Sequence, residues 1–480
     1  MSFLYVREKM LPQMPPPGGE QGAVKWMREN LFSSWLNSIL SVLAVLAIFW
    51  LIKSSLPWLL HSVWKANSLS ECRTIIAANW GEGATGACWA VIRERWHQFI
   101  FGFYPPESYW RPVWIFGAMF AALSPVLFND NLNARRLVLG GAFVLMMMAA
   151  ILTLPFLSVA QVALIIVSVA VCGFALVMPK KALWITLLFP ATAVWFLWGG
   201  SIWSPVMTMV GFAIIPLCYR LLVRRTGAAA AAIIAVVAAL VWWFYLQSAV
   251  SAPLARAIPI RLAHIDSDQF GGFLLAFSIG VTAIVASLPI GIILALGRKS
   301  DMLLIKTLCV GFIEFVRGVP LIAMLFTASL LLQYFLPRGT NFDLILRVDI
   351  LVTLFASAYI AEVIRGGLAA LPRGQSEAAD ALGLDYWQAQ RLIIMPQALK
   401  ISIPGIVSSF IGLFKDTTLV AFVGLLDPLK GITTIVRADI NWKGIYWEPY
   451  IFVGAIFFIF CFGMSRYSMY LENKLKRDHR

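Results

Sequence analysis

Long apolar runs separated by short polar connections account for most of the chain. A helix needs about 20 predominantly apolar residues to cross a bilayer, so each run predicts a membrane span. The twelve runs lie at about 34–60, 112–129, 137–155, 157–178, 182–199, 203–222, 227–249, 271–296, 304–334, 346–364, 402–425 and 448–470. The pattern therefore predicts an all-α integral membrane protein with about 12 transmembrane helices.

A stretch rich in helix breakers divides these spans into seven followed by five. It contains Pro253, Pro259 and the polar run 266–272. The five-helix part holds a further polar, basic segment at 365–401. The predicted organisation is an N-terminal tail at 1–33, a seven-helix extension at 34–250 with a polar loop at 61–111, a linker at 251–270, a five-helix unit at 271–470 and a C-terminal tail at 471–480.

Composition and charge support the membrane assignment. Charged residues make up 13% of the chain, whereas soluble domains carry about 25%. The net charge of +14 could indicate a nucleic-acid partner, but Lys and Arg also collect on the cytoplasmic connections of membrane proteins. With a cytoplasmic N-terminus, 23 of the 38 Lys and Arg residues fall on the cytoplasmic side, 12 outside and three within spans. We therefore expect no nucleic-acid partner, both termini and segment 365–401 in the cytoplasm, and loop 61–111 outside.

Local signals inside this cytoplasmic segment predict a short helix that ends at a sharp corner. Ser376 can cap the helix, and Glu377 in the first turn suits the positive end of the helix dipole. Ala378 and Ala379 continue the helix, and Gly383 allows the left-handed residue that stops it. The alanines would leave a small, smooth surface that fits a groove on another protein.

A second helix is predicted directly after the corner. Asp385 and Gln388 form a capping signal at its start. Pro396 is expected to disrupt or end this helix, because proline has no N–H to donate and its ring clashes with the preceding turn.

The spacing across the corner matches the motif EAA-x3-G-x9-I-x-L-P. An ordinary interfacial loop could contain Glu-Ala-Ala alone, but Gly383 and Pro396 stand at the required distances from Glu377. With the runs Arg317-Gly318-Val319-Pro320-Leu321 and Lys415-Asp416-Thr417-Thr418-Leu419, region 271–470 resembles the type I ABC importer permeases of the polar amino acid family. The long N-terminal region is similar to that of the larger permease subunits of general L-amino acid importers.

The resemblance implies a permease subunit of an ATP-driven importer for amino acids, of broad L-amino acid range, in a bacterial inner (plasma) membrane. It implies a periplasmic or exported amino acid-binding protein, a pair of ABC ATPase subunits and a second permease subunit, which we expect to be a different chain. The residues implied to couple to the ATPase are Glu377, Ala378, Ala379, Gly383 and Pro396. Independently, the sequence has no Gly-Lys dipeptide and hence no P-loop. We expect a transport subunit without its own ATPase site or cofactor, whose partner hydrolyses ATP.

Four ionisable residues lie inside predicted spans. Glu314 and Arg317 are three apart and therefore share one helix face, whereas Lys415 and Asp416 interrupt the run 402–425. Charges inside a bilayer are costly and are usually paired and functional. Two interpretations stay open: helix pairing, with Glu314 bound to Arg317, or contact with the substrate along the translocation path.

The cysteines and histidines suggest no metal site. Cys72 and Cys88 both lie in loop 61–111, on the side where disulfides persist, so a bridge between them is plausible. The four histidines are scattered without ligand spacing. The many aromatic residues of the same loop suit contact with membrane lipid, and docking of the binding protein is the alternative.

Two other function classes fit less well. A secondary transporter would also have twelve spans, but its coupling groups should recur in two matching halves, and these halves do not match. A membrane enzyme would need His, Asp, Glu or Cys residues converging on one face, and the sequence offers no such cluster.

Overall fold

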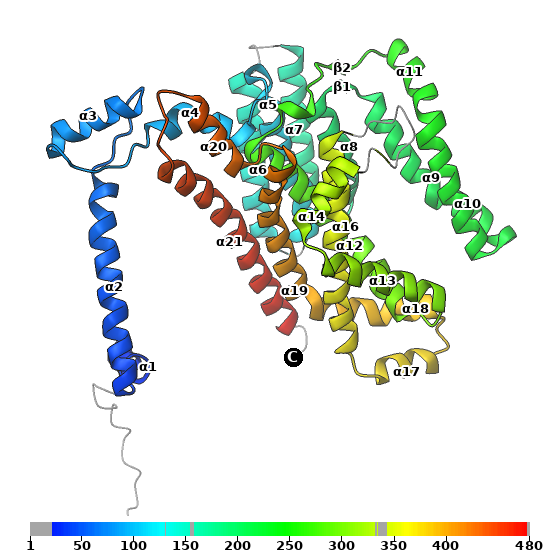
Figure 1. Ribbon diagram of the computed structural model, residues 1–480. Coiled ribbons are helices and arrows are strands. Elements are labelled where there is room, and N and C mark those ends of the chain that lie inside the picture. Colours follow the sequence, from blue (N-terminus) through cyan, green and yellow to red (C-terminus); the bar gives the residue numbers. More distant parts are fainter. Residues whose placement is uncertain (1–21, 130, 154–157, 332–333, 335–342, 478–480) are drawn as a thin grey trace, which may run out of the picture. The chain divides into compact units, whose positions relative to one another are not determined.

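The structure is a computed structural model that describes residues 22–129, 131–153, 158–331, 334 and 343–477. It is almost entirely helical (Figure 1), and the strands described, β1 (Gly200–Ser201) and β2 (Arg261–Leu262), form one antiparallel pair. The helices of the first half are α1 (Gly22–Asn30), α2 (Trp35–Leu60), α3 (Leu69–Trp80), α4 (Ala90–Phe101), α5 (Trp110–Leu127), α6 (Leu132–Thr153), α7 (Val159–Val177), α8 (Leu183–Trp198), α9 (Trp203–Thr226), α10 (Ala228–Val241) and α11 (Gln247–Ala257). Those of the second half are α12 (Gly272–Lys299), α13 (Leu303–Gly318), α14 (Leu321–Phe326), α16 (Leu344–Ala369), α17 (Gly374–Ala381), α18 (Tyr386–Ala389), α19 (Met395–Asp416), α20 (Pro428–Ala438) and α21 (Trp447–Arg477).

The predicted membrane-protein fold is confirmed. Within the described residues, 10 helices are long and apolar enough to cross a membrane, and the bent pair Leu303–Gly318 and Leu321–Leu331 would make 11. The apolar helix α8 is shorter. The predicted span 304–334 is not one straight helix, because Pro320 cannot donate a backbone hydrogen bond and the two parts meet at 104°.

The predicted linker at 251–270 begins inside a helix. Pro253 was expected to break the chain there, but α11 continues through it to Ala257. A π-helical turn at Trp242–Leu246 precedes α11, and α11 packs against α9. Packing of this kind holds a helix together across a proline, which then kinks the helix instead of ending it.

The chain forms two compact units. Unit 1 contains the described residues up to Glu94 together with Asp439–Glu448, and unit 2 contains Arg95–Ala438 and the described residues from Pro449 onward. The domain division drawn from the sequence stays a prediction.

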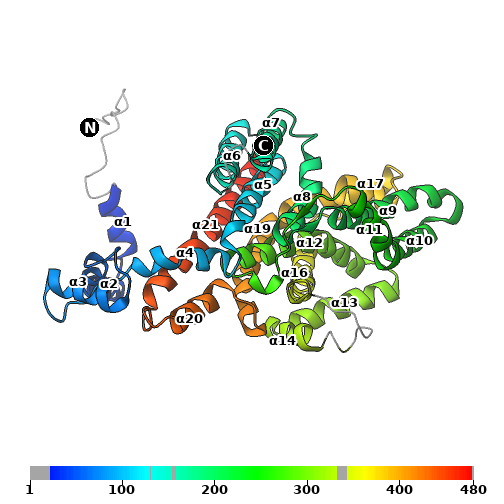
Figure 2. The same cartoon turned by 90° about the horizontal axis from the view of Figure 1, so that it is seen from above.

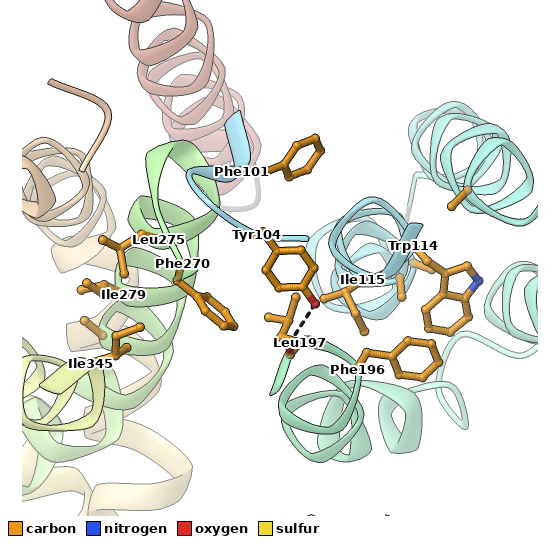
Figure 3. Packing of buried hydrophobic residues seen from close by; sticks show 14 of the residues in the cluster. Phe101, Tyr104, Trp114, Ile115, Phe196, Leu197, Phe270, Leu275, Ile279 and Ile345 are labelled. Atoms are coloured by element: carbon orange, nitrogen blue, oxygen red, sulfur yellow. Dashed lines mark hydrogen bonds between the residues drawn. The ribbon is translucent and has the colours of Figure 1, made fainter. Parts of the chain in front are cut away.

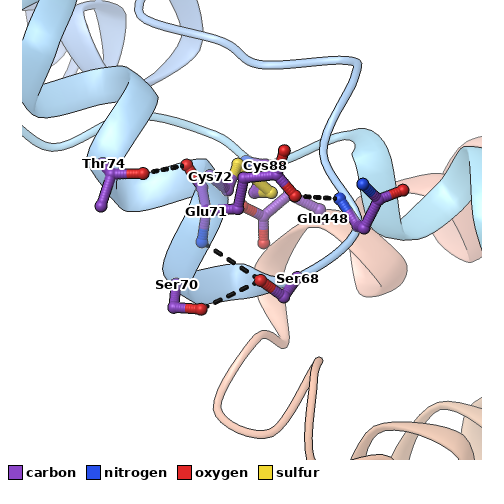
Figure 4. The surroundings of a disulfide bond; sticks show 8 residues. Ser68, Ser70, Glu71, Cys72, Thr74, Cys88 and Glu448 are labelled. Carbon is purple, nitrogen blue, oxygen red and sulfur yellow. Dashed lines mark hydrogen bonds between the residues drawn. A yellow bond between two sulfur atoms is a disulfide. The ribbon is translucent and has the colours of Figure 1, made fainter.

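Unit 1 gives the predicted outside loop a structure of its own. The Sγ atoms of Cys72 and Cys88 are bonded, with the two Cα atoms 6.2 Å apart (Figure 4). The Glu448 carboxylate accepts a hydrogen bond from the backbone N–H of Cys88 at 2.7 Å. The N–H of Leu69 donates to the carbonyl of Asn441 at 2.8 Å. Segments more than 300 residues apart in the sequence are therefore tied together within this unit.

Unit 2 is built around a large buried apolar cluster (Figure 3). Two polar groups inside it are paired: the Tyr104 hydroxyl donates to the carbonyl of Leu197 at 2.9 Å (Figure 3), and Trp114 Nε1 donates to Ser168 Oγ at 3.1 Å. An unpaired polar group in a lipid-like interior costs several kcal/mol, so these bonds fix how the helices pack. Helices α9, α10 and α11 form a separate group at one edge of the unit (Figure 2).

Helices α16 and α19 pack closely together and, with parts of α12, α13 and α17, form a second buried apolar cluster. A Cβ placed on Gly367 of α16 would overlap the Ser402 hydroxyl and lie 2.6 Å from the carbonyl oxygen of Ala398. Only glycine allows this approach, which is the small-residue packing typical of membrane helices. The segment between α16 and α19, which contains α17 and α18, joins the end of α16 to the start of α19.

Candidate functional site

The corner predicted around Gly383 is confirmed. Gly383 has φ of 69°, in the left-handed region. Its N–H donates to the carbonyl of Asp380 at 2.9 Å, and the N–H of Leu384 donates to the carbonyl of Ala379 at 3.2 Å. These two bonds form a Schellman motif, which satisfies the last carbonyls of α17 and turns the chain sharply.

The capping signal after the corner is also confirmed. The N–H of Gln388 donates to Asp385 Oδ1 at 2.8 Å, and the N–H of Asp385 donates to Gln388 Oε1 at 3.1 Å. This reciprocal capping box starts α18. The loop is therefore helix, corner and helix, and it joins the end of α16 to the start of α19 (Figure 1).

One detail of the prediction was wrong, and one was half confirmed. Ser376 does not cap α17, which begins at Gly374 with Arg373 in the cap position. Pro396 was expected to disrupt or end the second helix: a π-helical turn at Gln390–Ile394 interrupts the α-helix directly before it, but the helix does not end there, because α19 continues beyond. A π turn inserts an extra residue into the helix, and Pro396 then occupies the start of α19, where its missing N–H costs little.

The two alanines of the motif differ in their exposure. Ala378 is exposed beside the exposed Glu377, whereas Ala379 is fully buried in the cluster between α16 and α19. The prediction of a smooth alanine surface is therefore confirmed for Ala378 and wrong for Ala379. Gln397 Nε2 donates to Gln375 Oε1 at 2.9 Å, which further ties α17 to α19.

Exposed apolar residues at the corner were missed from the sequence. Leu382, Tyr386 and Trp387 have 73%, 51% and 70% of their surface exposed. The signal that could have found them is an aromatic pair standing inside an otherwise polar segment. Exposed aromatic and apolar groups beside a charged residue are typical of protein interfaces.

Glu314 and Arg317 do not pair with each other. Each takes its partner from another helix, which supports the helix-pairing interpretation with different partners. Arg298 Nη1 lies 2.8 Å from Glu314 Oε1 and 3.3 Å from Glu362 Oε2, and Arg317 Nη1 lies 3.7 Å from the same Glu362 oxygen. Arg365 Nη2 lies 2.6 Å from Glu362 Oε1. Glu362 is thus the centre of an ionic cluster that joins α12, α13 and α16.

Lys415 and Asp416 are neighbours in the sequence, but they lie in different surroundings. Asp416 lines a cavity of about 230 Å³ between α16 and α19. The other polar side chains among the described residues of its wall are Tyr359 and Ser409, and the remaining ones are apolar or glycine. Lys415 is exposed and does not line this cavity. Arg317 of the ionic cluster lies 5.7 Å from the centre of the Tyr359 ring, as a cation–π contact.

Comparisons with known proteins show which family the chain belongs to. The family described as "Binding-protein-dependent transport system inner membrane component" matches residues 287–477. The glutamate/glutamine/aspartate/asparagine transport system permease protein BztC of Rhodobacter capsulatus is 62% identical over 476 residues, which cover 99% of both chains. The chain belongs to the amino acid ABC transporter permeases.

Two further relatives differ in how much of this chain they cover. The inner membrane amino-acid ABC transporter permease protein YhdY of Escherichia coli is 33% identical over 96% of both chains. The glutamate/aspartate import permease protein GltK of E. coli O6:H1 is 31% identical over 42% of this chain and 91% of its own. The permease is a multi-pass inner-membrane subunit of an ATP-driven amino acid importer. It works with a binding protein and with an ATPase that hydrolyses the ATP, and has no ATPase site or cofactor of its own.

Proposed function

We propose that this permease conducts acidic amino acids and their amides, and that the cavity at Asp416 lies on their path. The printed activity of BztC, which covers glutamate, glutamine, aspartate and asparagine, supports this substrate class. The observation that carries the proposal is a small cavity whose described lining residues include a single carboxylate and no other charged side chain.

The chemistry of the cavity suits these substrates. The Asp416 carboxylate can bind the α-ammonium group that all amino acids share. Tyr359 and Ser409 carry hydroxyls, which both donate and accept hydrogen bonds. A hydroxyl can therefore bind either a side-chain carboxylate or a side-chain amide, so this wall does not discriminate glutamate from glutamine. A volume of about 230 Å³ is below the range of about 300–1,000 Å³ found for drug-sized ligands, as a small substrate requires.

The connection between cavity and loop supports a mechanical role. The cavity walls come from α16 and α19, and the same two helices lead directly into and out of the corner at Gly383. We propose that the ATPase binds the corner through Glu377, Ala378, Leu382 and Trp387. Closure of the ATPase pair would then swing α16 and α19 as rigid bodies and change which side of the cavity is open.

The second permease subunit is proposed to be a different chain. This permease has a long N-terminal extension, whereas relatives such as GltK align with only 42% of it. In a complex of one long and one short permease, only one of the two permease subunits would carry the extension. Mass spectrometry of the purified intact complex distinguishes a pair of different permeases from two copies of this chain.

Uptake by the reconstituted complex tests the substrate class. We expect ATP-dependent accumulation of radiolabelled glutamate in proteoliposomes, with unlabelled aspartate, glutamine and asparagine competing and leucine competing about tenfold less well, because leucine offers no side-chain polar group to the hydroxyls. Liposomes without the binding protein serve as the control. Equal competition by leucine would contradict the assignment of acidic amino acids and amides.

Labelling from the two sides of the membrane tests the proposed topology, with both termini in the cytoplasm. A membrane-impermeant maleimide should modify Glu377→Cys in inside-out vesicles but not in intact cells, because the coupling loop must face the ATPase. Trp64→Cys, an exposed position in unit 1, should give the opposite result. Labelling of residue 377 in intact cells would refute the proposed function.

A further inference from the structure

A basic cavity lies where four helices of the N-terminal extension meet. Helices α5 and α7 end there and α6 and α8 begin. The cavity has a volume of about 510 Å³ and is lined by Asn129, Arg135, Met178, Pro179, Lys180 and Lys181. Because two helices end and two begin at this place, their dipoles largely cancel, so the positive potential comes from the side chains.

Arg135 is built into the wall of this cavity. It is only 7% exposed, and its guanidinium donates to the carbonyls of Asn129 at 2.9 Å and Leu176 at 3.3 Å. Its Nε–H is buried and has no hydrogen-bond partner within the described part of the chain. Among the described residues, this buried cation is held by two neutral carbonyls and has one unpaired donor, an arrangement that suits a bound anion.

The surface next to the cavity is apolar. Val177, Leu183 and Trp184 flank the two lysines along the chain and are 73%, 50% and 66% exposed. Exposed apolar residues at the end of a membrane helix contact acyl chains, and tryptophan favours the level of the lipid headgroups. The lysines are exposed and can reach to the same level.

From these contacts we infer that the cavity binds the phosphate of an anionic phospholipid headgroup, with Arg135, Lys180 and Lys181 around the phosphate and the acyl chains along the start of α8. Basic pockets between membrane helices on the cytoplasmic side are suited to such headgroups. The excess of positive charge on this side of the chain places the cavity at the cytoplasmic leaflet.

The neighbouring charges favour this assignment. No carboxylate lines the cavity among the residues whose positions the structure describes. Asp130 follows Asn129 in the sequence and lies outside the described residues. A free phosphate would satisfy the cations equally well, but it would leave the apolar surface at Val177 and Trp184 unused.

Native mass spectrometry of the purified full-length permease, titrated with phosphatidylglycerol, tests the inference. We expect the double variant Lys180→Gln/Lys181→Gln to bind phosphatidylglycerol roughly tenfold or more weakly, since each lysine near an anionic headgroup contributes about a factor of five. The matched control is Arg224→Gln/Arg225→Gln, which removes the same charge from exposed positions at the end of α9. It should change binding by less than about twofold, because Arg224 and Arg225 do not line the cavity.

Three results would overturn the inference. They are equal losses in the two double variants, equal binding of phosphatidylcholine and phosphatidylglycerol by the unmodified chain, and displacement of the lipid by millimolar inorganic phosphate. The Lys180 and Lys181 side chains are exposed, so this variant should fold. The buried variant Arg135→Gln supplies a second measurement and should weaken binding further. Because the readout is lipid binding, failure here would leave the proposed transport function untouched.

Discussion

Replacing Gly383 by valine should reduce ATP-driven uptake at least tenfold while the complex continues to hydrolyse ATP. The residue has φ of 69°, and an L-residue in this region costs about 1–2 kcal/mol, more for a β-branched one. The chain would relieve this strain by opening the Schellman corner, which moves α17 relative to α19. The measurement is the ratio of transported substrate to ATP hydrolysed in proteoliposomes.

The control for this experiment separates backbone conformation from side-chain bulk. A Cβ at position 383 would meet no atom within 4 Å, so the permease itself has room for a side chain there. Asparagine tolerates the left-handed region far better than valine, and Gly383→Asn should therefore retain most of the coupled uptake. Normal uptake by the valine variant would contradict the coupling scheme, and equal loss in both variants would indicate a clash with the ATPase instead.

The corner could be predicted because its signals are local. Gly383 with its left-handed φ, and Asp385 with Gln388, act within four or five residues, and each was readable from the sequence alone. The predicted cap at Ser376 was wrong because nothing local compelled the helix to start there, and the observed cap, Arg373, lies three residues earlier. For Pro396, the choice between disrupting and ending the helix stayed open, because no local pattern reports the π turn before it.

The side-chain partners in the ionic cluster could not be predicted from local sequence patterns either. Glu314 and Arg317 share a helix face, which made their pairing reasonable. The actual partners, Arg298 and Glu362, lie 16 and 45 residues away along the chain. Contacts of that kind follow from the packing of α12 and α16 around α13. The cavity at Asp416 was hidden for the same reason, since Tyr359 and Asp416 come from different helices.

Exchange of Asp416 for asparagine should lower kcat/KM for uptake about 10–100-fold, because a charged hydrogen bond to the substrate ammonium contributes roughly 1.5–3 kcal/mol. The change removes one charge and keeps the shape of the side chain, so the packing of α19 against α16 should persist. The measurement is uptake in proteoliposomes at several concentrations of substrate-loaded binding protein, with ATPase activity recorded in the same preparation.

Two further variants decide whether the effect arises in the cavity. Asp416→Glu keeps the carboxylate and should recover part of the uptake, because the cavity has space for one more methylene beside Gly412. Asp266→Asn makes the same chemical change at a carboxylate that is 73% exposed and should leave uptake unchanged. If the Asp416→Asn variant transports like the unmodified permease, the ammonium group is bound elsewhere, and the path does not pass this carboxylate.

The comparison with Asp266→Asn separates a local effect from a general one. If Asp416→Asn and Asp266→Asn lose uptake equally, the loss reflects overall charge. Only a loss confined to residue 416 and partly restored by glutamate supports a cavity in which a single carboxylate holds the group common to every substrate.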